Sequence, residues 1–214
     1  MARPPRLNVV DGIYHITSRG VRRADIYEDE LDYRRFRRTL AQAFKEHGWI
    51  CHAFCQMPNH YHLVLETPAA NLSLGMQRLN WRYAVRFNWR HAYKGHLFES
   101  RFYSGAIESN AHLLEVARYV VLNPVRAGLC RHPAEWAFSS FRDPLSARLM
   151  GQFGHEPELA RERYEAFVLA GVDSSRVPVP GTRTRPNQPK PYVPAKRFAS
   201  RRTRTAAGRP TTFR

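Results

Sequence analysis

Apolar residues recur along the first 122 positions at two spacings, every second residue and every third or fourth residue. Alternation is typical of a half-buried strand, and the longer spacing is typical of an amphipathic helix. The two spacings follow one another in the order βαββαβα. The predicted strands are residues 11–18, 49–57, 60–66 and 101–107, and the predicted helices are residues 29–47, 72–89 and 111–122.

That order, with an antiparallel hairpin in its middle, predicts an α+β fold. We expect a ferredoxin-like or RRM-like sandwich, in which helices pack on a central antiparallel sheet. Pro58-Asn59 is the expected turn of the hairpin. One face of its first strand should carry four residues, Trp49, Cys51, Ala53 and Cys55. With a last short helix expected over residues 156–168, residues 1–170 should form one domain.

The net charge of +16 lies mostly at the C-terminal end of the chain. From residue 171 onward eleven Lys and Arg residues stand against one acid, and seven of the fifteen prolines lie there. A basic, proline-rich segment without periodicity is typical of a flexible arm that meets phosphate. Residues 171–214 are therefore expected to be a DNA-contacting tail, with a merely solvated segment as the alternative.

No apolar run reaches the roughly 18 residues of a membrane span. The N-terminus also lacks the apolar stretch of a signal peptide. We therefore expect a cytoplasmic protein without a membrane partner.

His60 and His62 follow directly after the expected hairpin turn. In a strand they share one face, because side chains alternate with period two. Two imidazoles on one face could form half of a metal site. The alternative is the polar face of a sheet in a chain that has ten histidines.

Four arginines recur at every fourth position along the helix expected over residues 72–89 and directly after it. This arginine stripe consists of Arg78, Arg82, Arg86 and Arg90. Guanidinium groups present forked donors that suit a phosphate backbone. Rings such as Trp81 and Trp89 among them suit stacking on unpaired bases. A solvated helix face, with most of the rings in the core, is the alternative.

Tyr119 and Asn123 are four residues apart, so they share one face of the last predicted helix. Pro124 disfavours helical geometry at the residue before it, so we expect the helix to end near Asn123. Arg118 should point about 100° away from Tyr119 around the helix. Because a free tyrosine has a pKa near 10, the phenolate of Tyr119 would need a bound ion or nearby arginines, and among the arginines we expect the arginine stripe to favour it.

Three ordered blocks carry a resemblance to a known family. They are Met57-Pro58-Asn59-His60-Tyr61-His62-Leu63-Val64, the segment from Gly95 to Ser104, and the segment from Tyr119 to Leu129. Together they resemble the signature blocks of the single-tyrosine HUH transposases. The last block and residues 136–142 are similar to the REP-associated tyrosine transposases, the bacterial branch linked to repetitive extragenic palindromes. The resemblance runs over about residues 8–143.

The resemblance implies a role for each residue that matches. His60 and His62 would be metal ligands, Asn123 the third ligand and Tyr119 the nucleophile. Two imidazoles and an amide would suit zinc or manganese by ligand softness, whereas the family implies Mg²⁺ or Mn²⁺ as the cofactor.

The implied activity is cleavage and strand transfer of single-stranded DNA at palindromic, REP-like hairpins through a 5′-phosphotyrosine intermediate. Three groups of arginines are expected to contact the DNA: Arg19, Arg22 and Arg23 at the single-stranded foot, the arginine stripe, and Arg101 in the second block. The expected location is the bacterial cytoplasm, at the nucleoid.

Two other functions remain open from the sequence. A non-catalytic regulator could bind hairpin DNA on the same scaffold, although a pure binder needs neither the histidines nor the tyrosine. An RNA-binding sheet would carry stacking aromatics on its central strands, where this chain has His60 and His62. A monomer and a dimer are both compatible with the sequence.

Overall fold

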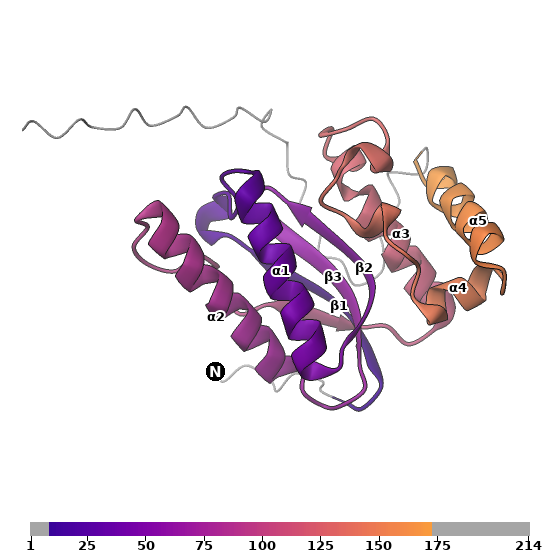
Figure 1. Ribbon diagram of the computed structural model, residues 1–214, viewed down its shortest axis with the longest axis horizontal. Helices are drawn as coiled ribbons and strands as arrows, with labels where there is room; N and C mark the ends of the chain where they lie inside the picture. Colours follow the sequence, from indigo (N-terminus) through magenta and orange to yellow (C-terminus); the bar gives the residue numbers. More distant parts are fainter. Residues whose placement is uncertain (1–8, 173–214) are drawn as a thin grey trace, which may run out of the picture.

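The computed structural model describes residues 9–172 and contains a four-stranded antiparallel sheet (Figure 1). The strands are β1 (Gly12–Arg19), β2 (Ile50–Met57), β3 (His60–Thr67) and β4 (Tyr103–Ala106). Their order across the sheet is β2-β3-β1-β4. This is the expected α+β sandwich of ferredoxin-like type. Most of the tail predicted over residues 171–214 lies outside the described residues, so its separation from a domain of residues 1–170 stays a prediction.

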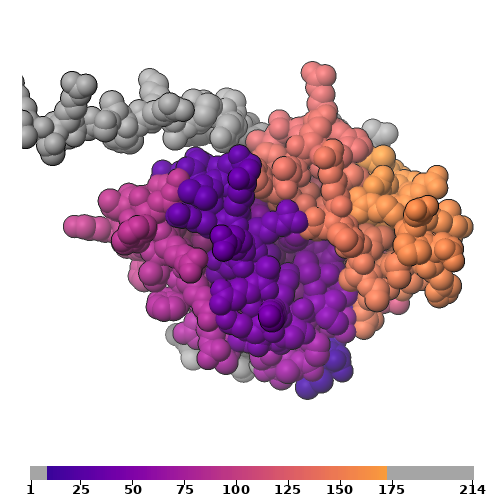
Figure 2. Space-filling view, in the orientation of Figure 1, coloured from indigo at the N-terminus to yellow at the C-terminus, as the bar shows by residue number. Residues whose placement is uncertain are grey.

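The helices form layers on the two faces of this sheet. On one face lie α1 (Glu30–His47) and α2 (Leu72–His91), which contact each other. On the other face lies α3 (Asn110–Arg126), which packs on β2 and β3. The helices α4 (Ala147–Phe153) and α5 (Pro157–Ala170) continue the α3 side of the molecule. Figure 2 shows them in orange, at the end away from α2 in magenta. None of the described helices is long and apolar enough to cross a membrane.

Three short 3₁₀ helices complete the described part of the chain. They are η1 (Val21–Arg23), η2 (Pro133–Glu135) and η3 (Ser140–Arg142). The seven-residue α4 was not predicted, although Ser146 caps its first turn by accepting a hydrogen bond from the amide of Leu149.

The sheet is buried on both faces, so alternate residues of β3 enter different cores. Tyr61, Leu63 and Leu65 pack against α1 and α2, whereas Val64 packs against α3. The side chains of His60 and His62 share the face of Val64, because they are an even number of positions from it. The two imidazoles therefore point to the α3 side of the sheet.

The expected common face of Trp49, Cys51, Ala53 and Cys55 is wrong because β2 contains a bulge. The pairing with β3 shifts between Cys51 and Ala53, which leaves His52 as an extra residue. An extra residue reverses the alternation that follows it. Trp49 and Cys51 accordingly belong to the α1 and α2 core, whereas Ala53 and Cys55 belong to the α3 core.

The expected end of α3 near Asn123 is also wrong, since the helix runs through Pro124 to Arg126. A proline inside a helix lacks an N–H donor and its ring crowds the carbonyl four residues earlier, yet the helix continues past Pro124. The turn is continued by the amide of Ala127, which donates to the Asn123 carbonyl at 2.9 Å, and by the amide of Leu129, which donates to the Pro124 carbonyl at 2.9 Å. Tyr119, Asn123 and Arg126 thus lie along one face of a continuous helix.

Candidate active site

Cross-strand pairs on the α3 side of the sheet form the base of the site. Arg19 lies opposite His60, and Thr17 lies opposite His62, in the antiparallel pairing of β1 with β3. Residues that oppose each other in this way present their side chains on the same face. Backbone pairing also continues at the end of β1, where the carbonyl of Arg19 accepts a hydrogen bond from the amide of Glu99 at 2.9 Å.

His62 is held by one of its ring nitrogens and leaves the other without a protein partner. Its Nδ1 lies 3.0 Å from Nε2 of His15 and 3.1 Å from Oγ1 of Thr17. Its Nε2 is buried and has no hydrogen-bond partner among residues 9–172. If Nδ1 carries the proton and donates to His15 or Thr17, the lone pair of Nε2 points into the site. That is the state in which imidazole binds a metal ion.

His60 is oriented by its neighbour in the hairpin turn. Its Nδ1 lies 2.6 Å from Oδ1 of Asn59, so the amide oxygen can accept a proton from this nitrogen. The other nitrogen, Nε2, then carries the lone pair. The rings of His60 and His62 have centroids 4.9 Å apart.

Burial keeps all three imidazoles of the site neutral. It lowers the pKa of His60 to about 3, with a further contribution from the charge of Arg19. It lowers the pKa of His62 well below its ordinary value, and the pKa of His15 to about 4. Metal ligation requires neutral imidazole, so these side chains are in the protonation state that an ion needs.

Tyr119 reaches the histidines from α3. Its ring centroid lies 5.6 Å from that of His62 and 6.0 Å from that of His15, both edge to face. Burial raises the pKa of its phenol, and a hydrogen bond from the side chain of Asn123 opposes that rise. The charges of Arg126 and Arg19 oppose it as well.

Arg126 was not predicted, and it replaces the arginine stripe as the charge beside Tyr119. Its guanidinium carbon lies 5.2 Å from the centroid of the Tyr119 ring. The expectation that the stripe would favour the phenolate is wrong, because α2 lies on the other face of the sheet. The spacing of seven residues from Tyr119 could have identified Arg126, had the helix been extended through Pro124.

Arg19 and Arg126 both have a side-chain nitrogen that the protein leaves unpaired. The Nε atoms of both are buried and find no hydrogen-bond partner within the described part of the chain. A buried donor without an acceptor is costly, so such atoms are typical of sites that a ligand completes. Two cationic donors whose charges act on one tyrosine suit an anion such as a phosphodiester.

A divalent ion fits the donor set of this site. The unpartnered Nε2 of His62 and the lone pair expected on Nε2 of His60 are two nitrogen ligands. Asn123 donates from Nδ2 to the Tyr119 carbonyl at 2.9 Å, which anchors its amide beside the tyrosine. Among residues 9–172, no three His, Cys, Asp or Glu side chains form a metal-binding group. The amide oxygen of Asn123, the DNA or water would thus have to complete the coordination.

Outside the arginine stripe, the other three predicted DNA-binding arginines lie at two places. Arg22 and Arg23 are exposed in η1, both with positive φ, 54° and 62°. This loop is tied to the hairpin turn, because the amide of Gly20 donates to the Asn59 carbonyl at 2.9 Å. Arg101 is exposed just before β4.

The arginine stripe is split between paired and unpaired members. Arg82 forms an ion pair with Glu46 of α1 at 2.6 Å. Arg90 pairs with Asp29 at 2.5 Å and with Asp32 at 2.6 Å. Arg78 and Arg86 are exposed. Two of the four charges are therefore partly neutralised within the protein.

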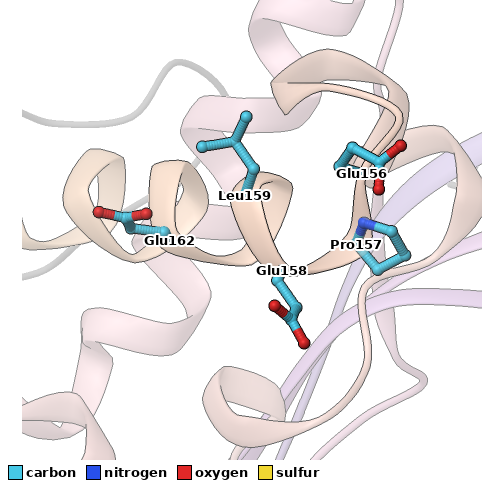
Figure 3. A pocket seen from close by; sticks show the side chains of 5 residues that line it. All are labelled: Glu156, Pro157, Glu158, Leu159 and Glu162. Atoms are coloured by element: carbon cyan, nitrogen blue, oxygen red, sulfur yellow. The ribbon is translucent and has the colours of Figure 1, made fainter.

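A surface hollow at the start of α5 is unrelated to this site. It is lined by Glu156, Pro157, Glu158, Leu159 and Glu162, and Figure 3 shows its carboxylates. Carboxylates repel phosphate, so this hollow does not suit DNA.

Comparison with known proteins gives matches to a family model, to a relative and to a solved structure. Residues 8–123 match the family model of the IS200-like transposases. A Haemophilus influenzae protein described as a REP-associated tyrosine transposase is 26% identical over 136 residues, which are 58% of this chain and 77% of the relative. A solved structure of a REP-associated tyrosine transposase bound to a REP hairpin has a TM-score of 0.58 and 20% identity, over 67% of this chain and 85% of that chain. The matches confirm the resemblance, and the last confirms the fold.

Proposed function

Because this chain belongs to the family of IS200-like transposases, we propose that it is a metal-dependent endonuclease and strand transferase for single-stranded DNA. Its substrates are palindromic, REP-like hairpins, the ligand named for the structurally similar transposase. The observation that carries the proposal is the approach of Tyr119 to His62, whose buried Nε2 has no partner.

Tyr119 is the nucleophile of the proposed reaction. Its phenol oxygen attacks the scissile phosphorus, the bond from phosphorus to the 3′-oxygen breaks, and that oxygen takes up a proton to leave as a 3′-hydroxyl. The phenol loses its proton in the same event. The products are a 5′-phosphotyrosine and a free 3′ end, so a second 3′-hydroxyl can reverse the reaction without an external energy source.

His60, His62 and the amide of Asn123 hold a divalent ion, Mg²⁺ or Mn²⁺. A bound ion would supply Lewis-acid polarisation of the scissile phosphate and stabilisation of the charge that develops on it. His15 and Thr17 position His62, because the N–H at Nδ1 donates to one of them, which fixes the ring and leaves the lone pair on Nε2.

Arg126 and Arg19, the two arginines with an Nε unpaired in the described structure, stabilise negative charge in the proposed reaction. Arg126 stabilises the phenolate of Tyr119 and so opposes the rise in its pKa that burial causes. Arg19 faces His60 across the strands, so we assign it to the scissile phosphate rather than to reading of the foot. Arg22 and Arg23, exposed on the adjoining loop, remain the candidates for the foot, and Arg101 for the neighbouring backbone.

The decisive experiment tests for a covalent adduct. Full-length protein is incubated with a labelled hairpin oligonucleotide that carries single-stranded flanks, in Mn²⁺ or Mg²⁺, and resolved under denaturing conditions. The wild type should form an adduct that Tyr119→Phe abolishes. Tyr103→Phe is the matched control, because this tyrosine is exposed on β4, and it should react normally.

Other outcomes would contradict the proposal. Tight hairpin binding with no adduct in either metal would favour the non-catalytic regulator. Preferential binding of RNA of the same sequence would favour the RNA-binding function.

A further inference from the structure

The outer face of α2 exposes large apolar side chains that the core does not use. Trp89 is 84% exposed, Trp81 64% and Val85 49%. These three residues are four positions apart, so they follow one line along the helix. Leu74, 49% exposed, extends the line toward the N-terminal end of α2.

The core of the protein is complete without these indoles. The opposite side of α2 buries its own row of apolar residues, which are Leu72, Met76, Leu79, Tyr83 and Phe87. Indole rings are among the largest apolar groups, and a contiguous row of them in water is typical of a binding surface.

The charge around the row indicates the partner. The helix contains four arginines and no acidic residue. Arg82 and Arg90 pair with acids of α1 and the segment before it, and no ion pair within residues 9–172 involves Arg78 or Arg86. At 100° per residue, Arg78 lies within the apolar row and Arg86 lies along its side. A partner therefore meets aromatic rings together with uncompensated positive charge.

We propose that the outer face of α2 binds single-stranded DNA, with bases stacked on Trp81 and Trp89 and phosphates contacting Arg78 and Arg86. Base stacking on aromatic rings and arginine contacts along the backbone are the means by which proteins hold unpaired strands without reading their sequence. The two indoles are eight residues apart, which is about 12 Å along the helix axis. A few unpaired nucleotides cover that distance.

This surface is separate from the candidate active site. α2 and α3 lie on opposite faces of the sheet, as Figure 1 shows. The nucleotides bound along α2 are therefore not the nucleotides beside Tyr119. They give the protein a second contact with the DNA that flanks the hairpin. The proposal rests on α2 alone, so it does not require that the protein cleaves DNA.

The test is binding of full-length protein to a labelled twelve-residue oligothymidylate, which cannot form a hairpin, in EDTA. The absence of metal keeps cleavage out of the measurement. Trp81→Ala and Trp89→Ala should each weaken binding at least about fivefold, the lower end for loss of one stacked base. Trp89→Phe should retain more affinity than Trp89→Ala, since it keeps a ring. Leu31→Ala, which truncates an exposed apolar residue of α1, should bind as the wild type does.

Tryptophan fluorescence distinguishes DNA binding at this surface from DNA binding at other basic parts of the chain. Trp49 is buried and Trp136 half-buried, so quenching by the oligonucleotide should come from Trp81 and Trp89. Arg78→Gln should lower the salt dependence of binding.

Three results would overturn the proposal. One is unchanged affinity in both tryptophan-to-alanine variants. Another is tighter binding of oligouridylate than of oligothymidylate. The third is a wild-type dimer that these variants turn into a monomer with unchanged DNA affinity, which would make the face a contact between two copies of the chain.

Discussion

Replacing Arg126 with glutamine should slow formation of the covalent Tyr119 adduct by about 10- to 100-fold. The guanidinium carbon lies 5.2 Å from the ring centroid. At an effective dielectric constant of about 20, a unit charge at that distance contributes about 3 kcal/mol. Arg126 is half-buried, and solvent screening lowers the contribution to about 1.5–2.5 kcal/mol. Each 1.36 kcal/mol changes a rate about tenfold.

The assay is the single-turnover rate of adduct formation on a labelled hairpin at saturating Mn²⁺. Arg118→Gln is the matched control, because Arg118 is on the same helix but pairs with Glu115 and lies over the ring of Phe167. Loss of Arg126 should raise the pKa of the Tyr119 phenol further, so the rate profile should move to higher pH. A rate within twofold of the wild type, or an equal loss in both variants, would refute the reasoning.

Three further predictions concern stability and are measured by thermal or urea unfolding. Mn²⁺ at about 100 times its dissociation constant should stabilise the wild type by about 2.7 kcal/mol, and His62→Gln should remove that gain because the unpartnered Nε2 is lost. Gly75→Ala should destabilise the protein by about 1–3 kcal/mol, since a Cβ there would lie 2.2 Å from Trp49 Cζ2. Gly151→Ala, with open space around it, should stabilise the protein by up to about 1 kcal/mol. A gain in stability at both sites would contradict the packing argument. Ser109→Ala should cost about 1 kcal/mol by removing the N-cap of α3, and an unchanged urea midpoint would show that the cap is dispensable.

The helices and strands could be predicted because their burial follows local spacing. The apolar row of α2 is buried as its periodicity indicates. Asp29 and Ser109 cap α1 and α3 by accepting hydrogen bonds from backbone amides three residues ahead, as residues of their type do. Gly48 ends α1 with a φ of 67°, a conformation that glycine adopts readily.

The surroundings of the candidate nucleophile could not be predicted in the same way. His15 and Thr17 reach His62 only because β1 pairs with β3, across 47 and 45 residues of chain. Arg126 joins Tyr119 only because α3 tolerates Pro124. Such contacts depend on which strands pair and where a helix ends. The spacing of apolar residues within one segment predicts neither.

The bulge at His52 bears on how relatives of this protein should be aligned. Before it, β2 points Cys51 toward α1 and α2, and after it Ala53 points toward α3. A relative with an unbulged strand would be one residue shorter here, and a gap set elsewhere would equate positions that face α1 and α2 with positions that face α3. Deleting His52 from this chain would exchange the faces of the residues on one side of the bulge. The register of the hairpin that carries His60 therefore depends on this single inserted residue.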